Sequence, residues 1–340
     1  MTNRELTEMR EAQWLSPHAC LSTASRGRER AEEPCQTRTA FQRDRDRILH
    51  SKGFRRLQGK TQVYIAPEGD HFTTRLTHTL AVAQIARTLA RALRLNEDLT
   101  EAIALGHDLG HTPFGHIGER SLNQLMPEGF RHNEQSKRVV ERLEAGGNGL
   151  NLTWEVRNGI LCHSGPEQPA TLEGACVRRA DRIAYLNHDL DDALRSKVLR
   201  DFDIPADCLR ILGRTHSERI NTMILDIIQE SQDRDTLQMS PLVQSATDGL
   251  REFMFEKVYR NSWRAAEELR CDYVMKALFG YYCEHPGELP EDYLMIVYQE
   301  GSQRGVCDFL SGMTDRYAIR LFQHLFVPSG YPVDFTLDSE

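Results

Sequence analysis

The stretch LTHTLAVAQIARTLARAL, residues 76–93, indicates a helical protein. Its apolar residues recur at intervals of three and four positions, which places them on one face of an α-helix, whereas a half-buried strand would alternate at every second residue. The segment is also long enough for five helical turns at about 3.6 residues each. The predicted buried face comprises Leu76, Leu80, Ala83, Ala86 or Ala90, and Leu93.

Similar patterns on both sides of this stretch predict further helices. Asn96 can cap a helix over about 97–109, which Gly110 and Pro113 would end. The strand signal is weak, and TQVYIA at 61–66 is the best candidate for a short hairpin. We therefore expect an all-α helical bundle with at most a short β-hairpin near 61–66. The other predicted helices cover about 133–144, 175–195, 216–230, 243–268, 290–300 and 304–325.

Length and composition limit the class of protein. The chain has 340 residues, of which 40% are hydrophobic and 27% charged, as is typical of a globular protein with a substantial core. No run approaches the ~18 consecutive apolar residues of a membrane span, and the polar N-terminus has no secretory apolar segment. The eight cysteines are scattered without a CxxC pair, which argues against a zinc ribbon or a disulfide framework. We expect a cytoplasmic protein with no membrane partner.

Charge is unevenly distributed along the chain. The formal net charge is −8, but residues 26–60 hold eleven Lys/Arg against five Asp/Glu. Such a segment is either a phosphate-binding surface or a solvated arginine-rich stretch, and composition does not separate the two. Because the rest of the chain is acidic, capture of a small polyphosphate is favoured over binding of extended duplex DNA.

Metal-ligand residue types are concentrated in GHDLGHTPFGHIGE, residues 106–119. His107 and Asp108 stand where a predicted helix ends, so an imidazole nitrogen and a carboxylate oxygen can reach one cation. His78 shares a stripe of the preceding helix with apolar residues, and Asp181 lies on a later helix. Two nitrogens and two oxygens suit Mn, Fe, Co, Ni or Zn, and suit Mg less because Mg prefers oxygen ligands.

A structural interpretation of the same residues stays open on spacing alone. A histidine on an apolar face is more often a hydrogen-bonded core residue than a ligand, and the HD dipeptide recurs at His188-Asp189. The glycines and the proline between the donors favour a site. A turn can bring His107 and Asp108, and then His116 and Glu119, to one place, which a straight helix could not easily do.

Several longer motifs resemble one family. His78, His107-Asp108 and Asp181, with spacings of 29 and 73 residues, are similar to the ligand set of the HD superfamily of metal-dependent phosphohydrolases. From about residue 15 to 260 the chain resembles the deoxynucleoside triphosphate triphosphohydrolases, in particular their bacterial dGTPase-like branch. The resemblance is carried by RDRILHSKGFRRLQGKTQVY (45–64), GDHFTTRLTHTLAVAQIAR (69–87), GHDLGHTPFGHIGE (106–119), FRHNEQS (130–136), ADRIAYLNHDLDDA (180–193) and FMFEKVYR (253–260).

The resemblance implies a reaction and a cofactor. That family removes the whole triphosphate from a deoxynucleoside triphosphate, leaving a deoxynucleoside and tripolyphosphate. It implies one divalent metal ion in each subunit (Mn, Mg, Co, Fe, Ni or Zn). It leaves open which of two histidines donates the proton to the leaving group. The matching positions are His78, His107, Asp108 and Asp181 for the metal, and His116, Glu119 and His132 for catalysis.

The resemblance also implies substrate contacts. A tyrosine packed against the sugar C2′ would disfavour a ribose 2′ hydroxyl, although spacing alone favours a plain core aromatic at that position. For His111, a structural hydrogen bond to the backbone is an equal alternative to a phosphate contact. The matching positions are Gln62 for the sugar, Arg75, His111 and Arg182 for the phosphates, Tyr185 for the sugar face and Asp189 for the 3′ hydroxyl.

We expect the chain to have three parts. Residues 1–42 are polar and form an N-terminal arm that is extended or partly disordered unless a partner chain orders it. Residues 43–270 form the HD phosphohydrolase domain. Residues 271–340, to which the resemblance contributes little, form a helical extension packed on that domain.

Other functions stay open. A different HD-type phosphohydrolase, such as a nucleotide phosphatase or a phosphodiesterase, could use the same ligands. A nucleotide-sensing or nucleic-acid-binding regulator is disfavoured, because the ligand set is intact and His116 and Glu119 are present. The expected partners are deoxynucleoside triphosphates and further copies of the chain, since relatives are homo-oligomers that are often activated by a nucleotide at subunit contacts.

Overall fold

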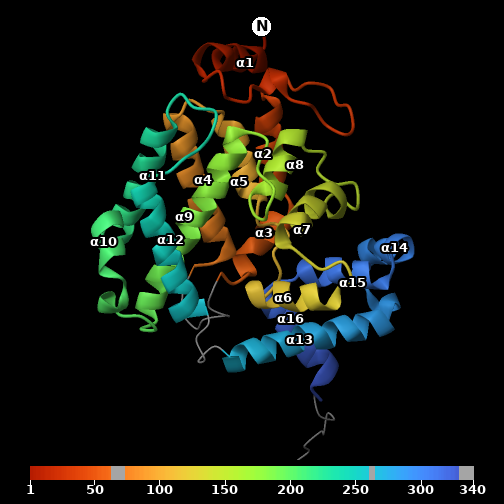
Figure 1. Cartoon of the computed structure of the whole chain (residues 1–340). Coiled ribbons are helices and arrows are strands. Elements are labelled where there is room, and N and C mark those ends of the chain that lie inside the picture. Colours follow the sequence, from red (N-terminus) through yellow and green to blue (C-terminus); the bar gives the residue numbers. More distant parts are fainter. Residues whose placement is uncertain (63–72, 260–264, 329–340) are drawn as a thin grey trace, which may run out of the picture.

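The computed structural model describes residues 1–62, 73–259 and 265–328, and the regular structure in these ranges is helical (Figure 1). This confirms the predicted all-α fold. Of the hairpin predicted near 61–66, only Thr61 and Gln62 lie within the described residues, and Thr61 pairs with Thr74 through an isolated antiparallel bridge. None of the described helices is long and apolar enough to cross a membrane.

The larger hydrophobic core is built around α4 (Arg75–Ala92). This helix packs against α5 (Glu97–Gly106) and α9 (Leu172–Arg195). In turn, α5 contacts α2 (Ala40–Leu49) and α8 (Trp154–Cys162). The central helices begin at residues whose side chains accept a hydrogen bond from a free backbone N–H group. The sequence predicted such a cap for α5. Thr74 caps α4 and Asn96 caps α5.

The face of α4 that carries His78 is the buried one. Val82, Ile85 and Leu89 on the same stripe are almost fully buried. Leu80, which the sequence analysis assigned to the buried face, is 49% exposed, so that assignment was wrong. The reason is that α5 and α9 cover the His78 stripe, whereas Leu80 lies on a neighbouring, solvent-open stripe, where it lines a surface pocket with Glu101 and Leu105 of α5.

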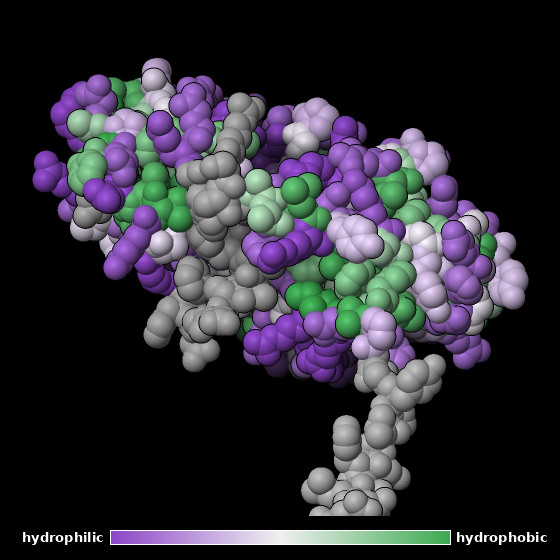
Figure 2. Space-filling view, turned by 90° about the horizontal axis from the view of Figure 1, so that it is seen from below, coloured by the Kyte–Doolittle hydropathy of each residue, from purple (hydrophilic) through white to green (hydrophobic). Residues whose placement is uncertain are grey.

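A second hydrophobic core lies below the first in Figure 1 and joins the middle of the chain to its C-terminal helices. Here α6 (His116–Leu125) packs on α13 (Ala265–Glu284), which also contacts α15 (Ser302–Ser311) and α16 (Asp315–Phe326). The predicted boundary at 270/271 falls inside α13. The C-terminal helices therefore pack directly on the segment that follows His107-Asp108. Viewed from their side, apolar surface gathers over α13 and α16 (Figure 2), where Leu269, Tyr273 and Phe326 are exposed.

Most other helices lie where the sequence predicts them, but two predicted helices are interrupted. The one at 243–268 is α12 (Pro241–Met254) followed by a π-helical turn over Phe255–Tyr259. The one at 304–325 is α15 and α16, because Thr314 caps a new helix between them. A π-helical turn over Val139–Leu143 also continues α7. The remaining α-helices are α3 (Lys52–Arg56), α7 (His132–Arg138), α10 (Ala206–Leu212), α11 (His216–Ser231) and α14 (Glu291–Glu300).

The N-terminal arm predicted for residues 1–42 begins with a helix, which corrects the expected extended conformation for that part, whereas residues 15–39 are irregular apart from a 3-10 turn at Ser22–Ala24. Helix α1 (Asn3–Trp14) is started by a reciprocal capping box between Thr2 and Glu5. Its Glu11 is buried and accepts hydrogen bonds from the backbone and hydroxyl of Ser22. Local capping and these buried hydrogen bonds stabilise α1 and attach it to the residues that follow it.

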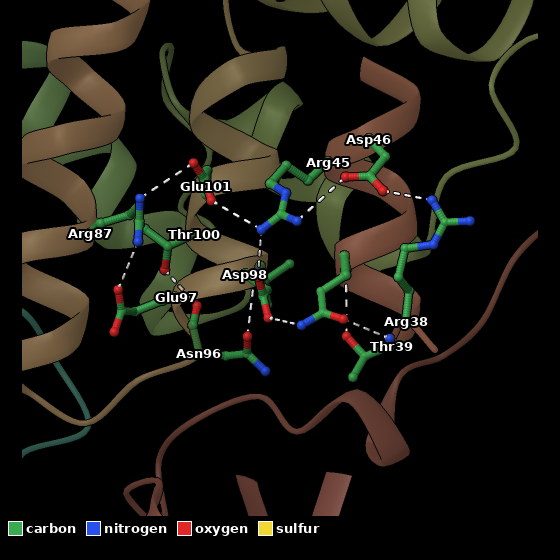
Figure 3. A network of polar contacts seen from close by, with 12 residues as sticks. Arg38, Thr39, Arg45, Asp46, Arg87, Asn96, Glu97, Asp98, Thr100 and Glu101 are labelled. Carbon is green, nitrogen blue, oxygen red and sulfur yellow. Dashed lines mark hydrogen bonds and ion pairs between the residues drawn. The ribbon is translucent and has the colours of Figure 1, made fainter. Parts of the chain in front are cut away.

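Five of the eleven Lys/Arg between residues 26 and 60 pair with carboxylates of the same chain. Arg28 pairs with the fully buried Asp44. Arg45 lies 2.8 Å from Asp98 and 3.3 Å from Glu101, and it stands between these residues in Figure 3. Further pairs are Arg38 with Asp46, and Arg43 and Arg47 with Glu32. The structure therefore favours a structural role for these arginines over an open phosphate-binding surface.

Candidate functional site

Two glycines allow the chain to turn tightly around His107 and Asp108. A Cβ on Gly106, the last residue of α5, would lie 2.5 Å from Cδ1 of Ile160 on α8. A Cβ on Gly110 would lie 2.1 Å from the backbone nitrogen of Ser136 on α7. Larger residues would push these helices away. The glycines therefore bring the end of α5 close to α7 and α8, and both of those helices supply histidines to the site.

The structure brings the four predicted metal ligands together. Ligand atoms of His78, His107 and Asp108 all lie within 4.8 Å of one another, and the three residues are buried. Oδ1 of Asp181 is 3.0 Å from Nε2 of His78 and 3.8 Å from Nε2 of His107. His78 lies on α4, His107 and Asp108 directly follow α5, and Asp181 lies on α9. The packing of these three helices therefore assembles the set.

This donor set fits a divalent cation. Nδ1 of His107 lies 2.6 Å from the carbonyl oxygen of Ala104, to which it donates, and this leaves the Nε2 lone pair free. That Nε2 is buried and has no hydrogen-bond partner among the described residues, as expected of a nitrogen oriented toward an ion. Two imidazoles and two carboxylates suit a transition-metal ion or zinc.

Arg75 pairs with one of these candidate ligands. Its Nη1 is 2.8 Å from Oδ2 of Asp108, and its Nη2 is buried without a partner among the described residues. Burial acts to raise the pKa of Asp108, but the charges of Arg75 and the neighbouring histidines outweigh it and hold that pKa well below its usual range. Asp108 is therefore an anion here, which is the form that binds a cation.

A strained turn carries the chain from this centre to α6. Phe114 is buried and has a φ of 62°, which is uncommon for a residue with a side chain, and Gly115 follows with a φ of 60°. The Thr112 hydroxyl donates to the carbonyl oxygen of Gly115 at 2.9 Å. Oδ1 of Asp315 on α16 accepts from the backbone N–H of Phe114 at 3.0 Å. Because α6 begins at His116, directly after this turn, the contacts that hold the turn also determine the positions of His116 and Glu119.

Glu119 lies between two histidines. Its Oε1 is 2.8 Å from Nδ1 of His132, and its Oε2 is 3.5 Å from Nδ1 of His116. Burial acts to raise the pKa of Glu119, but His132 and His116 hold it far below its usual range. Burial lowers the pKa of His132, and Glu119 more than reverses this, so that pKa is raised. His116 has a 76% exposed side chain, whereas His132 is largely enclosed.

One further histidine of the site, His163, was not predicted from the sequence. This residue is buried, and its Nε2 is 3.2 Å from Nε2 of His132. Its ring is also 4.9 Å from that of His107. His163 follows the last residue of α8 as His107 follows that of α5, and each Nδ1 bonds the carbonyl three residues earlier. A histidine after an apolar helix, before a glycine-containing loop, was the signal in GILCHSG (159–165).

Three predicted substrate residues lie against this centre. Gln62 is buried, and its Oε1 has no partner among the described residues. Nε2 of His111 is also buried and has no hydrogen-bond partner among the described residues. The His111 ring is 5.7 Å from that of His116 and 5.0 Å from that of His132. Burial lowers the pKa of His111 well below its usual value, so it is neutral. The third residue is Arg75.

The other three predicted substrate residues lie on α9. Asp181, Tyr185 and Asp189 are four residues apart and therefore share a face. Tyr185 is partly buried, and Asp189 accepts a hydrogen bond from the hydroxyl of Tyr259. Burial raises the pKa of Asp189 to about 6.

Arg182 is placed differently. It is exposed and lines a pocket of about 630 Å³ with Arg178 and Arg179, and that pocket contains no other predicted site residue.

Comparison with known proteins identifies the family. The HD domain model matches residues 75–186, and the phosphohydrolase-associated domain model matches 237–324. A deoxyguanosinetriphosphate triphosphohydrolase-like protein of Caldanaerobacter subterraneus subsp. tengcongensis is 56% identical over 97% of both chains. One of Desulfatibacillum aliphaticivorans is 47% identical over 97% of this chain and 99% of its own. A hypothetical protein of Aquifex aeolicus of known structure aligns over 84% of this chain and 68% of its own, with a TM-score of 0.47 and 18% identity.

The matched ranges fit the geometry described above. The HD domain match contains the candidate metal ligands together with His116, Glu119, His132 and His163, and the second match contains α13, α14, α15 and most of α16. The two relatives match this chain over nearly its whole length. The chain belongs to the HD phosphohydrolase family, in the group of deoxyguanosinetriphosphate triphosphohydrolase-like proteins.

Proposed function

We propose that this protein hydrolyses deoxynucleoside triphosphates, either dGTP or several dNTPs, to the deoxynucleoside and tripolyphosphate. One observation carries the proposal. The four candidate metal ligands lie beside a carboxylate, Glu119, that contacts two histidines, in a chain whose relatives have dGTPase-like names. Water would attack the α-phosphorus, and the bond from that phosphorus to the sugar 5′ oxygen would break.

The cation would be held by His78, His107, Asp108 and Asp181. When bound there, it would supply positive charge to an α-phosphate oxygen or to a water molecule. Arg75 and His111 would bind phosphate oxygens, and a guanidinium is suited to contact two oxygens at once. Arg75 would have to exchange its contact with Asp108 for the substrate, and its unpartnered Nη2 is already available for one.

The leaving 5′ oxygen needs a proton, and His116 is our candidate to deliver it. The His116 ring is open to solvent and can exchange protons with water, and Oε2 of Glu119 lies near its other side. Glu119 would orient the ring for this transfer. His132, bonded to the other oxygen of Glu119, is the second candidate.

Sugar recognition would come from α9 and from Gln62. Tyr185 would pack on C2′ and select deoxyribose, and Asp189 would accept from the 3′ hydroxyl in place of Tyr259. Gln62 would contact the sugar through its buried and unpartnered Oε1. Arg182 would reach the phosphates only by turning out of the pocket that it lines with Arg178 and Arg179. We further propose that the chain acts as a homo-oligomer, with a nucleotide activator at the subunit contacts.

The products test the proposal. The metal-loaded protein is incubated with each dNTP, singly and mixed, and the products are separated by ion-exchange chromatography. Tripolyphosphate with the free deoxynucleoside supports the proposal. Orthophosphate or pyrophosphate would instead indicate another HD-type phosphohydrolase, whose chemistry the same ligands could support.

A further inference from the structure

Arg178, Arg179 and Arg182 on α9 form a group of positive charges outside the candidate metal centre. They line a pocket of about 630 Å³ that contains none of the candidate metal ligands and none of the predicted catalytic residues. A pocket of this volume can enclose a small molecule. Asp235 is the only carboxylate among the described residues that line it, although the chain as a whole is acidic. The pocket is therefore positively charged.

The first of these arginines is held in place without being neutralised. Nη1 of Arg178 donates to the carbonyl oxygens of Cys162 and Glu167 at 2.8 and 2.7 Å, and Nη2 donates to that of Gly165 at 2.7 Å. Carbonyl oxygens accept hydrogen bonds but carry no net charge, so the positive charge of the guanidinium remains. The end of α8 and the loop that follows it thus fix Arg178 at the wall of the pocket.

The other two arginines also form no ion pair among the described residues. Nη1 of Arg179 lies 3.3 Å from the amide oxygen of Gln244, and the amide nitrogen of Gln244 in turn donates to Asp248 at 2.9 Å. A neutral amide therefore stands between Arg179 and that carboxylate. Arg182 is exposed and forms neither a hydrogen bond nor an ion pair with another described residue.

The three charges repel one another. Arg182 lies four residues after Arg178 and three after Arg179, and like charges at such spacings destabilise a helix. Burial and the charge of Arg182 lower the pKa of both Arg178 and Arg179. The pKa of Arg45 is instead raised, because nearby carboxylates, Asp98 first among them, outweigh its burial. An anion in the pocket would offset the repulsion on α9 as these carboxylates do for Arg45.

We propose that this pocket binds a polyphosphate chain, either inorganic or carried by a nucleotide. Each guanidinium group can contact two phosphate oxygens at once, and three such groups in one pocket suit a chain of phosphates. The neutral side chains of Gln168, Thr171 and Thr236 line the same pocket and can add hydrogen bonds. A small anion fits better than an acidic protein surface, because the arginines line a hollow. The inference does not depend on which phosphoester the candidate metal centre hydrolyses.

Calorimetric titration of the metal-free chain with tripolyphosphate tests the site. The full chain is stripped with a chelator, which is then removed by gel filtration, so that neither cation nor chelator competes for the anion. We expect Arg179→Gln to weaken the binding of tripolyphosphate about 10-fold or more, because charge-assisted hydrogen bonds are lost. Arg210→Gln on α10 is the matched control and should bind as the wild type does, since that side chain is 72% exposed and lies outside the pocket.

A third variant separates the pocket from the candidate metal centre. Arg75 contacts Asp108 there, so Arg75→Gln should leave the affinity for tripolyphosphate unchanged if the anion binds on α9. The opposite pattern, with affinity lost in Arg75→Gln and kept in Arg179→Gln, would place the anion at the metal centre and overturn the proposal. The absence of measurable binding to the wild type would overturn it as well. Melting temperatures show whether each variant is folded.

Chemical modification of the wild type gives a second readout that needs no variant. Phenylglyoxal reacts with accessible arginines, and peptide mass spectrometry measures the reaction at each one. Tripolyphosphate should slow the modification of Arg182 and leave that of Arg210 unchanged, whereas an unchanged rate at Arg182 would contradict the site. Titration with dATP beside tripolyphosphate distinguishes the two sources. Tighter binding of dATP would indicate a nucleotide, and equal or weaker binding would indicate inorganic polyphosphate. A failure of the dNTP hydrolysis assay leaves these affinities unchanged, so the two proposals fail separately.

Discussion

Asp315 on α16 accepts a hydrogen bond from the backbone N–H of Phe114, which lies 201 residues earlier in the chain. The other oxygen of Asp315 accepts from the backbone N–H of Thr61 at 3.0 Å and from its hydroxyl. One buried carboxylate thus fixes both the strained turn before His116 and the residue next to Gln62. This connection assigns a positioning role to the C-terminal helices.

Replacing Asp315 by alanine should therefore reduce both stability and turnover. Two backbone N–H groups would lose their buried acceptor, at a cost of about 1–3 kcal/mol each. Release of the turn should displace His116 and Glu119, and a displacement of about 1 Å can cost about 10²-fold in rate. We expect kcat to fall while bound metal per chain stays constant, measured by steady-state kinetics and metal analysis. Asp207→Ala is the control, because that side chain is 86% exposed. Unchanged kcat in Asp315→Ala would remove the positioning role.

The central helices could be predicted from the sequence, and so could the four candidate metal ligands that they carry. His78 and Asp181 lie on long helices with a clear apolar period, although that period also placed the exposed Leu80 on the buried face. His107-Asp108 stands at a helix end marked by glycine. The N-terminal helix was missed although its capping box, Thr2 and Glu5, is visible in the sequence. A short polar helix has too little apolar periodicity to be distinguished from an extended arm.

Other parts of the site could not be found from the sequence, because they depend on long-range packing. His163 becomes a neighbour of His132 only when α7 and α8 pack together, and the two residues are 31 positions apart. Asp315 meets Thr61 across 254 positions. The basic segment at 26–60 could be interpreted only once Asp98 and Glu101 were seen beside Arg45 (Figure 3). No periodicity or local spacing encodes such contacts.

Asp108→Ala should abolish turnover and metal retention together. Asp108 is one of the four candidate metal ligands, and its removal also leaves the Nη1 of Arg75 unpaired in a buried place. We expect less than one metal ion per chain and no product above background, measured by metal analysis and chromatography. Asp207→Ala again serves as control. Full activity in Asp108→Ala would refute the metal centre.

His116→Ala should keep the metal and lose most of the rate. The side chain is 76% exposed and lies outside the set of four candidate metal ligands, so the free energy of unfolding should change little. Loss of general acid–base catalysis typically costs about 10²–10⁴-fold. Single-turnover rates compared with metal content and melting temperature check this, and His18→Ala provides a histidine control. A normal rate would exclude His116 from the mechanism.

Glu173 should make stability depend on pH in a direction opposite to that of most carboxylates. This side chain at the start of α9 is fully buried, and its Oε1 accepts from the backbone N–H groups of Cys20 and Asn96. Burial raises its pKa to about 7. Between the unfolded value of about 4.5 and 7 the folded state therefore binds the extra proton, so the stabilisation is complete below about 4.5 and is lost as the pH rises through 7.

Glu173→Gln should remove this dependence, because the amide oxygen can still accept both hydrogen bonds without a charge. Relative to wild type, the variant should gain free energy of unfolding between about pH 5 and about pH 8, by at most about 3 kcal/mol. Urea unfolding at both pH values measures the difference, in which the other titrating groups cancel. The exposed Glu134, with 58% of its side chain accessible, supplies the control Glu134→Gln, whose difference from wild type should be small at both pH values. If Glu173→Gln differs from wild type by the same amount at both pH values, the buried carboxyl does not titrate in this range.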